Sequence, residues 1–228
     1  MSPSAVLSEA WELYKRHWQH LLPLALVVYL LLSLLVLALA ALLGWLGAIA
    51  ALLVSIVGTF WLQGALVIAV EDVRDGRADL TIGETLSRVR PQINTLTLAG
   101  LLAGIGILIG FALLIVPGLV LLTWWLFIVP VIMLEGASVM ESFGRSRDLG
   151  RGNGWNVFGL LILTILIILL AQIALSLILI PLPDAIQGFV GNVVSNTLFT
   201  PFVAAAWTLG YYHLKGLETS AEAEPATY

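Results

Sequence analysis

Long apolar runs, separated by short polar or glycine- and proline-containing stretches, repeat along most of the chain. A helix rises about 1.5 Å per residue, so roughly 20 apolar residues cross the ~30 Å hydrocarbon layer of a membrane. The fourth run is the shortest and contains Pro130, so we expect it to be tilted or kinked. The pattern predicts six transmembrane helices, at 21–43, 46–70, 93–116, 119–134, 155–180 and 185–212.

The first run has an alternative interpretation, as the core of a secretory signal peptide. The small residues of Ala38-Leu39-Ala40 resemble a cleavage site. However, the run is longer than the roughly 7–15 residues of such a core, and it starts only after an amphipathic segment. We therefore favour a transmembrane helix.

Composition agrees with membrane insertion and excludes several classes of function. Hydrophobic residues make up 60% of the chain and charged residues 11%, against about 25% charged residues in a soluble domain. The net charge of −4 argues against nucleic acid as a partner, because no basic excess is present to neutralise phosphates. The chain has no cysteine, so disulfides, thiolate chemistry and cysteine-based metal sites are excluded.

Basic residues lie only in the terminal segments and in the second and fourth connections between the apolar runs. The other connections contain no Lys or Arg, and they turn around Gly44-Trp45, Pro117-Gly118 and the 181–184 segment. Because loops rich in Lys and Arg stay in the cytoplasm, this distribution places both termini there. The ten basic residues are Lys15, Arg16, Arg74, Arg77, Arg88, Arg90, Arg145, Arg147, Arg151 and Lys215.

Three similar segments precede the first, third and fifth predicted helices. Each has a Glu (Glu9, Glu84 or Glu141) with apolar residues two positions before and after it, and a basic residue six positions later. Apolar side chains at this spacing share one helical face, which is typical of an amphipathic helix in the membrane interface. The prediction is an all-α integral membrane protein with one domain, 1–215, of three hairpin units near 4–72, 80–134 and 138–213, with a possible pseudo-threefold repeat, and a disordered cytoplasmic tail at 216–228.

Glu84 and Glu141 each follow a hydroxyl residue by three positions, in Thr81-x-x-Glu84 and Ser138-x-x-Glu141. This spacing is typical of a capping box, in which the hydroxyl and the carboxylate each bond a backbone amide at a helix start. A catalytic or ion-coupling role is the alternative. We favour helix capping, because it already gives both carboxylates a structural role.

Neutral polar residues occur inside three predicted transmembrane helices. Such residues are costly in lipid and tend to face protein, water or a ligand. They predict either hydrogen bonds between helices, which we favour, or the lining of a cavity between the second, fifth and sixth helices. The cavity candidates are Gln63, Gln172, Asn192 and Asn196.

Glycines repeat at a spacing of four in the third predicted helix. Gly100 and Gly104 form one G-x-x-x-G pattern, and Gly106 and Gly110 form another. Small residues at this spacing allow two membrane helices to approach closely. We therefore expect this helix to pack tightly against a neighbour, in the same chain or in a second one.

The third unit carries a set of short motifs that resembles a known family. These are Ile115-Val116-Pro117-Gly118, Leu134-Glu135-Gly136, Glu141-Ser142-Phe143 with Arg145-Ser146 and Leu149, and Gly152-Asn153-Gly154-Trp155 with Phe158-Gly159. The chain, over roughly 5–215, resembles the glycerophosphoryl diester phosphodiesterase membrane domain and related small six-span bacterial inner-membrane proteins of unassigned function. The resemblance implies a bacterial inner-membrane location.

In fused members, the resemblance implies a separate soluble barrel that hydrolyses glycerophosphodiesters with a divalent metal. Only the short 216–228 segment follows the last predicted helix, so we expect no hydrolase activity. The three histidines, His17, His20 and His213, lack metal-hydrolase spacing, and no phosphate-binding loop is present. We predict no enzyme activity, no metal and no cofactor.

Five arginines beside the third and fifth predicted helices are the candidates for a binding role, because a guanidinium group pairs well with phosphate. The simpler interpretation is that they only set topology. The leading hypothesis is a non-enzymatic membrane module that engages phospholipid headgroups, including those of anionic lipids, or a membrane or cytoplasmic partner protein. The alternative is a small-solute or lipid carrier or channel. The headgroup candidates are Arg88, Arg90, Arg145, Arg147 and Arg151.

Overall fold

The protein is described here by a computed structural model that covers residues 1–74, 76, 78–181 and 183–223. These residues form helices without strands, so the predicted all-helical fold is confirmed for this part of the chain. The elements are α1 (Pro3–Arg74), α2 (Ile82–Val89), the 3₁₀ helix η1 (Arg90–Gln92), α3 (Ile93–Leu113), α4 (Ile115–Trp124), α5 (Ile128–Glu135), α6 (Val139–Leu149), α7 (Gly154–Leu179) and α8 (Asp184–Ala223).

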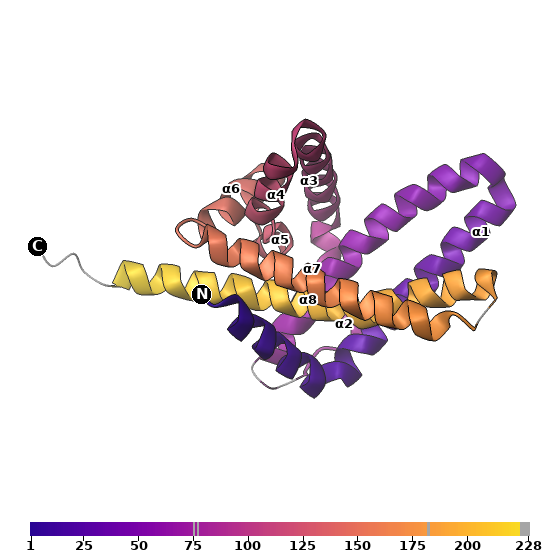
Figure 1. The fold of residues 1–228 in the computed structure, drawn as a ribbon, viewed down its shortest axis with the longest axis horizontal. Coiled ribbons are helices and arrows are strands. Elements are labelled where there is room, and N and C mark those ends of the chain that lie inside the picture. Colours follow the sequence, from indigo (N-terminus) through magenta and orange to yellow (C-terminus); the bar gives the residue numbers. More distant parts are fainter. Residues whose placement is uncertain (75, 77, 182, 224–228) are drawn as a thin grey trace, which may run out of the picture.

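α1 is interrupted at two residues and folds back on itself as a hairpin (Figure 1). His17 leaves helical geometry with φ −116° and ψ 21°, which separates the amphipathic start of the helix from its first apolar arm. Gly44, with φ 55° and ψ −129°, adopts a conformation that suits glycine and makes the tight turn. The two arms pack closely, because a Cβ placed on Gly58 would lie 2.4 Å from the Leu32 side chain.

α3 and α4 form a second hairpin, but its turn lies earlier than the sequence predicts. The break is at Leu114, an extended residue with φ −164° and ψ 155°, whereas Pro117 and Gly118 are already inside α4. The first turn of a helix leaves its amide groups without internal partners, so a proline there costs no hydrogen bond. A predicted turn at Pro117-Gly118 is therefore wrong by about one helical turn.

α4 and α5 form one apolar stretch that is broken between Trp124 and Ile128, as the presence of Pro130 suggests. Proline has no amide hydrogen, so the Leu126 carbonyl lacks its usual helical donor. Ser146 of α6 bonds to two other backbone groups at this break. Its buried hydroxyl donates to the Trp124 carbonyl at 2.7 Å and accepts from the Phe127 amide at 3.1 Å.

α7 and α8 lie side by side as a third hairpin, and α8 packs mainly against α1 (Figure 1). α8 continues as far as Ala223. The prediction of a disordered tail is therefore wrong for 216–223, where Glu218 on the same helix makes a contact described below. Residues 224–228 lie outside the described residues.

The buried core gathers at the ends of the hairpins remote from their turns. Its members come mostly from the stretches 6–29, 62–73, 126–137 and 204–214. Toward the turns, large apolar side chains are exposed, including Leu42 at 81%, Leu113 at 71% and Ile178 at 72%. In Figure 1 the three hairpins diverge in this direction. Such exposure suits a protein surrounded by lipid.

By length and composition, five helical stretches of the described chain could cross a membrane. α1 counts once in this number although it turns back at Gly44.

Candidate binding sites

Four of the five predicted headgroup arginines are exposed. Arg88 lies at the end of α2 and Arg90 begins η1, while Arg147 lies on α6 and Arg151 follows it. Within the described part of the chain, these four arginines make no ion pair with a carboxylate. Their charges are therefore available to an external anion.

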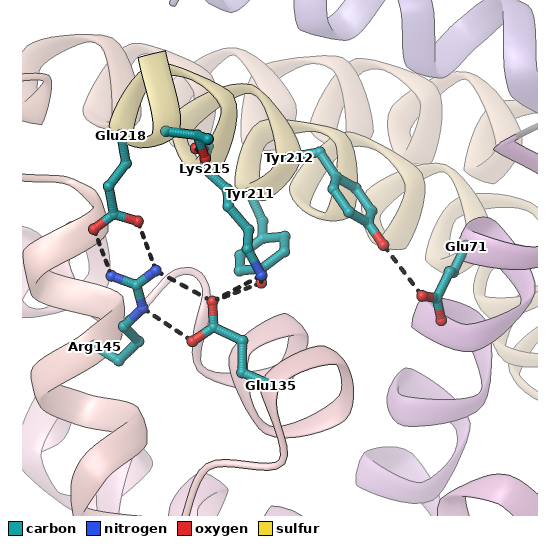
Figure 2. A network of polar contacts seen from close by, with 8 residues as sticks. Glu71, Glu135, Arg145, Tyr211, Tyr212, Lys215 and Glu218 are labelled. Carbon is teal, nitrogen blue, oxygen red and sulfur yellow. Dashed lines mark hydrogen bonds and ion pairs between the residues drawn. The ribbon is translucent and has the colours of Figure 1, made fainter. Parts of the chain in front are cut away.

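Arg145 is placed differently, between two carboxylates from other helices (Figure 2). Its Nε donates to Glu135 of α5 at 2.9 Å, and its two terminal nitrogens each donate to Glu218 of α8 at 2.7 Å. The hydrogen bonds to Glu218 and then to Glu135 raise the pKa of the guanidinium above its ordinary value. In this arrangement its donors are engaged by protein groups rather than by a headgroup.

Tyr211 and Lys215 of α8 complete this ion-pair cluster (Figure 2). The buried Tyr211 hydroxyl donates to Glu135 at 2.7 Å and accepts from the Lys215 ammonium at 2.9 Å. Lys215 also lies 3.4 Å from the Glu135 carboxylate. The cluster joins α5, α6 and α8, and each charge in it has a partner.

Tyr212 and His213, which follow Tyr211 on α8, contact α1. The Tyr212 hydroxyl donates to Glu71 at 3.4 Å, and the Arg74 guanidinium lies 3.7 Å from the centre of the Tyr212 ring. His213 contacts Glu9 at 2.7 Å. Among the described residues, no group of three His, Asp or Glu side chains is placed to hold a metal ion.

An apolar groove of about 650 Å³ lies between α4 and α7. Arg147 lies at its border, with its guanidinium 4.4 Å from the centre of the Trp124 ring, and Arg151 directly precedes Gly152 in the groove wall. Trp155 is 86% exposed at the start of α7. The groove is lined by Val116, Leu119, Val120, Thr123, Trp124, Gly152, Gly154, Trp155 and Phe158.

The predicted polar residues line three neighbouring cavities that have Asn196 in common. Gln63 and Asn196 line one cavity of about 280 Å³, between α1, α5 and α8. Asn192 and Asn196 line a second one of about 520 Å³, between the two arms of α1 and α8. Gln172, Asn192 and Asn196 line a third one between α7 and α8. Asn196 also pairs locally, since its amide donates to the Asn192 carbonyl at 2.8 Å.

The sequence did not indicate two further polar residues that line these cavities. Thr208 is fully buried and lines the 280 Å³ cavity with Trp207, and neither the hydroxyl of the one nor the indole nitrogen of the other has a hydrogen-bond partner among the described residues. An isolated Thr in an apolar run carries no pattern, since such a hydroxyl usually bonds its own backbone. The spacing of Thr208 alone therefore gave no signal.

Glu84 and Glu141 both take part in capping boxes. The Thr81 amide donates to Glu84 at 2.8 Å, and the Glu84 amide donates back to the Thr81 hydroxyl at 3.3 Å. The Ser138 amide donates to Glu141 at 3.3 Å. These contacts start α2 and α6, the helices that carry Arg88 and Arg147.

Long apolar helices with large exposed apolar side chains define the class of this molecule as an all-helical integral membrane protein. The sequence model of a family described as a domain of unknown function, DUF7847, matches residues 12–214, and the chain belongs to this family. The chain matches no curated protein and no solved structure.

Proposed function

We propose that the protein is a non-enzymatic membrane module that binds anionic phospholipid at the α4/α7 groove, with Arg147 and Arg151 contacting the headgroup. The observation that carries this proposal is the guanidinium of Arg147 over Trp124, which lines an apolar groove whose wall also contains Gly152, the residue after Arg151. A guanidinium group donates paired hydrogen bonds to phosphate, and an apolar groove accepts an acyl chain. One amphipathic ligand satisfies both surfaces.

The placement in the membrane is part of the proposal. The turn in α1 at Gly44 divides it into two apolar arms, and α4 with α5 provides one further crossing, which supports six crossings in three hairpin units. The distribution of Lys and Arg favours cytoplasmic termini, and the resemblance to the phosphodiesterase membrane domain favours a bacterial inner membrane. Arg147 and Arg151 then lie at the leaflet that carries anionic lipids.

The hydrogen bonds and ion pairs that the ionisable side chains make within the protein support a non-catalytic role. Glu135, Arg145, Lys215 and Glu218 bond to one another, and they hold three helices together. A catalytic acid or base must reach a substrate, whereas these groups are engaged in structural contacts. We therefore propose binding rather than chemistry for this face.

Native mass spectrometry from mild detergent tests the proposal, with added phosphatidylglycerol as the anionic probe and phosphatidylcholine as the neutral one. We expect the wild-type protein to retain phosphatidylglycerol. Each basic residue near a lipid surface contributes about 1 kcal/mol, so the Arg147→Gln, Arg151→Gln double variant should bind roughly 30-fold more weakly. Filling the groove with Val120→Trp should reduce binding without changing charge.

The Arg88→Gln, Arg90→Gln double variant is the matched control, because it removes the same charge away from the groove. Equal retention of phosphatidylglycerol by the wild type and the Arg147, Arg151 variant would overturn the proposal. A loss of the same size in both double variants would indicate general surface attraction rather than a site. Co-purification of a protein that the groove variant no longer holds would favour the partner-protein hypothesis instead.

A further inference from the structure

Hydrogen-bonding groups of α1 and α8 line the 280 Å³ cavity between α1, α5 and α8, and among the described residues no charged side chain contributes to its wall. Tyr29 and Thr200 in its wall bond to each other, with 3.2 Å between their hydroxyl oxygens. The other polar groups in the wall are Thr59, Gln63, Asn196, Trp207 and Thr208. A phosphate or carboxylate would find no cation here, so the wall suits an uncharged ligand.

Two of these groups lack partners in the described structure. The Thr208 side chain is fully buried, and both its hydroxyl and the indole nitrogen of Trp207 are shielded without a hydrogen bond. A buried polar group without a partner is strongly unfavourable, so native proteins satisfy such groups with protein, water or ligand atoms. The ligand should therefore offer an acceptor to Trp207 and a hydroxyl partner to Thr208.

The cavity adjoins the 520 Å³ cavity between the arms of α1, and Tyr29, Thr59 and Asn196 line both. Val36, Leu37, Ala40 and Phe189 contribute apolar side chains to the larger cavity, beside the polar Ser33, Ser55 and Asn192. A wall that combines apolar and uncharged polar groups suits an amphipathic molecule.

The ion-pair cluster lies beyond the Thr208 side of the small cavity. One helical turn beyond Thr208 on α8, the fully buried Tyr211 bonds to Glu135, and Arg145 and Glu218 extend the cluster. The larger cavity, which shares wall residues with the small one, is therefore the route that the proposal assigns to the ligand.

We propose that the small cavity binds an uncharged hydroxyl-bearing group, such as a glycerol moiety, carried either by a neutral lipid or by a free polyol. In the lipid case the acyl chains lie in the larger cavity, between the arms of α1. This site is separate from the α4/α7 groove and takes a ligand without charge. The two proposals can therefore be tested independently of each other.

Binding of dioctanoylglycerol to the purified protein tests the site, with dioctanoylphosphatidylglycerol as the charged comparison and native mass spectrometry as the readout. We expect one dioctanoylglycerol per chain, and about tenfold weaker binding in the Thr208→Val, Gln63→Leu double variant because two hydrogen bonds are lost. Thr197→Val is the matched control: Thr197 is also buried without a partner among the described residues, but it does not line this cavity. Val has nearly the shape of Thr, so folding should be unaffected.

A second experiment uses free glycerol as the probe. Because the chain has no native cysteine, one introduced cysteine reports on the cavity alone. In an Asn196→Cys variant, glycerol should slow modification by a water-soluble methanethiosulfonate reagent if the ligand is a free polyol. Protection by dioctanoylglycerol alone would assign the site to a neutral lipid.

Three results would overturn the proposal. These are failure of both probes to bind or protect, equal binding of the charged lipid in the cavity, or an equal loss of binding in the Thr197→Val control. The Arg147→Gln, Arg151→Gln variant should keep its affinity for dioctanoylglycerol, which separates this result from the groove experiment.

Discussion

Arg145 shows how one side chain can join three helices. It lies on α6, and its hydrogen bonds reach Glu135 on α5 and Glu218 on α8. The side chain is 27% exposed, and its partners are 19% and 39% exposed. The cluster is thus intermediate between an exposed pair, worth about 0–1 kcal/mol, and a fully buried one, whose disruption costs about 3–5 kcal/mol.

Replacement of this arginine should destabilise the protein. We expect Arg145→Gln to lower the free energy of unfolding by about 1–3 kcal/mol, because Glu135 keeps part of its burial but loses its main donor. Thermal unfolding in detergent, followed by tryptophan fluorescence, measures the effect. Arg147→Gln, which removes an exposed arginine two residues away, should change the midpoint little. Equal midpoints for both variants would show that the cluster adds no stability.

At the scale of elements, the glycines of α3 have different neighbours although they share one sequence pattern. A Cβ on Gly100 would lie 1.9 Å from the Phe60 ring of α1, and one on Gly106 would lie 2.7 Å from the Trp125 ring. At Gly104 no atom lies within 4 Å. Only one glycine of the Gly100-x-x-x-Gly104 pair is therefore at a close helix contact.

Alanine substitution separates these two glycines. Gly100→Ala should destabilise the protein by about 1–3 kcal/mol, because the Phe60 ring must move out of a packed position. Gly104→Ala should be neutral or stabilise by up to about 1 kcal/mol, since alanine has the higher helix propensity and meets no neighbour. Thermal unfolding of both variants under the same conditions provides the comparison, and a larger loss at Gly104 would contradict this packing.

The break between α4 and α5 combines a local cause, Pro130, with hydrogen bonds from a distant residue. Pro130 in the sequence indicates that the apolar stretch is not a regular helix, but not how its free backbone groups are satisfied. Ser146, which lies 22 residues after Trp124 in the sequence, provides the hydrogen bonds. In the sequence Ser146 is one of two serines on α6, and its spacing does not show that it faces this break.

For the whole molecule, the core and the 520 Å³ cavity occupy different parts of the hairpins. Side chains pack densely where α1, α5 and α8 meet near their charged ends, and the hairpins separate toward the turns. The 520 Å³ cavity lies in the separated part, lined by Val36, Leu37 and Ala40 of the first α1 arm. The arrangement suits entry of a ligand from the side of the turns.

The proposed orientation can be tested on intact bacterial cells with a membrane-impermeant maleimide. Trp45 is 74% exposed at the α1 turn, and Gly83 is exposed at the start of α2. Because the chain has no cysteine, Trp45→Cys and Gly83→Cys each introduce a single label site. We expect Trp45→Cys to react in intact cells and Gly83→Cys only after permeabilisation. The reverse pattern would contradict the proposed orientation and place the α1 turn in the cytoplasm.

The sequence by itself determined the class of this protein, because the length and hydrophobicity of its segments are local properties. The same holds for the Gly44 turn, the break in the apolar stretch that contains Pro130 and the capping boxes of Glu84 and Glu141, since each depends on residues within a few positions. Tertiary structure alone decided which charges pair and which polar groups share a cavity. Glu135 and Glu218 both bond to Arg145, and Gln63 shares a cavity with Asn196 and Thr208, only because distant helices pack together. A sequence pattern records spacing along one helix, whereas these contacts depend on the rotation and register of several helices.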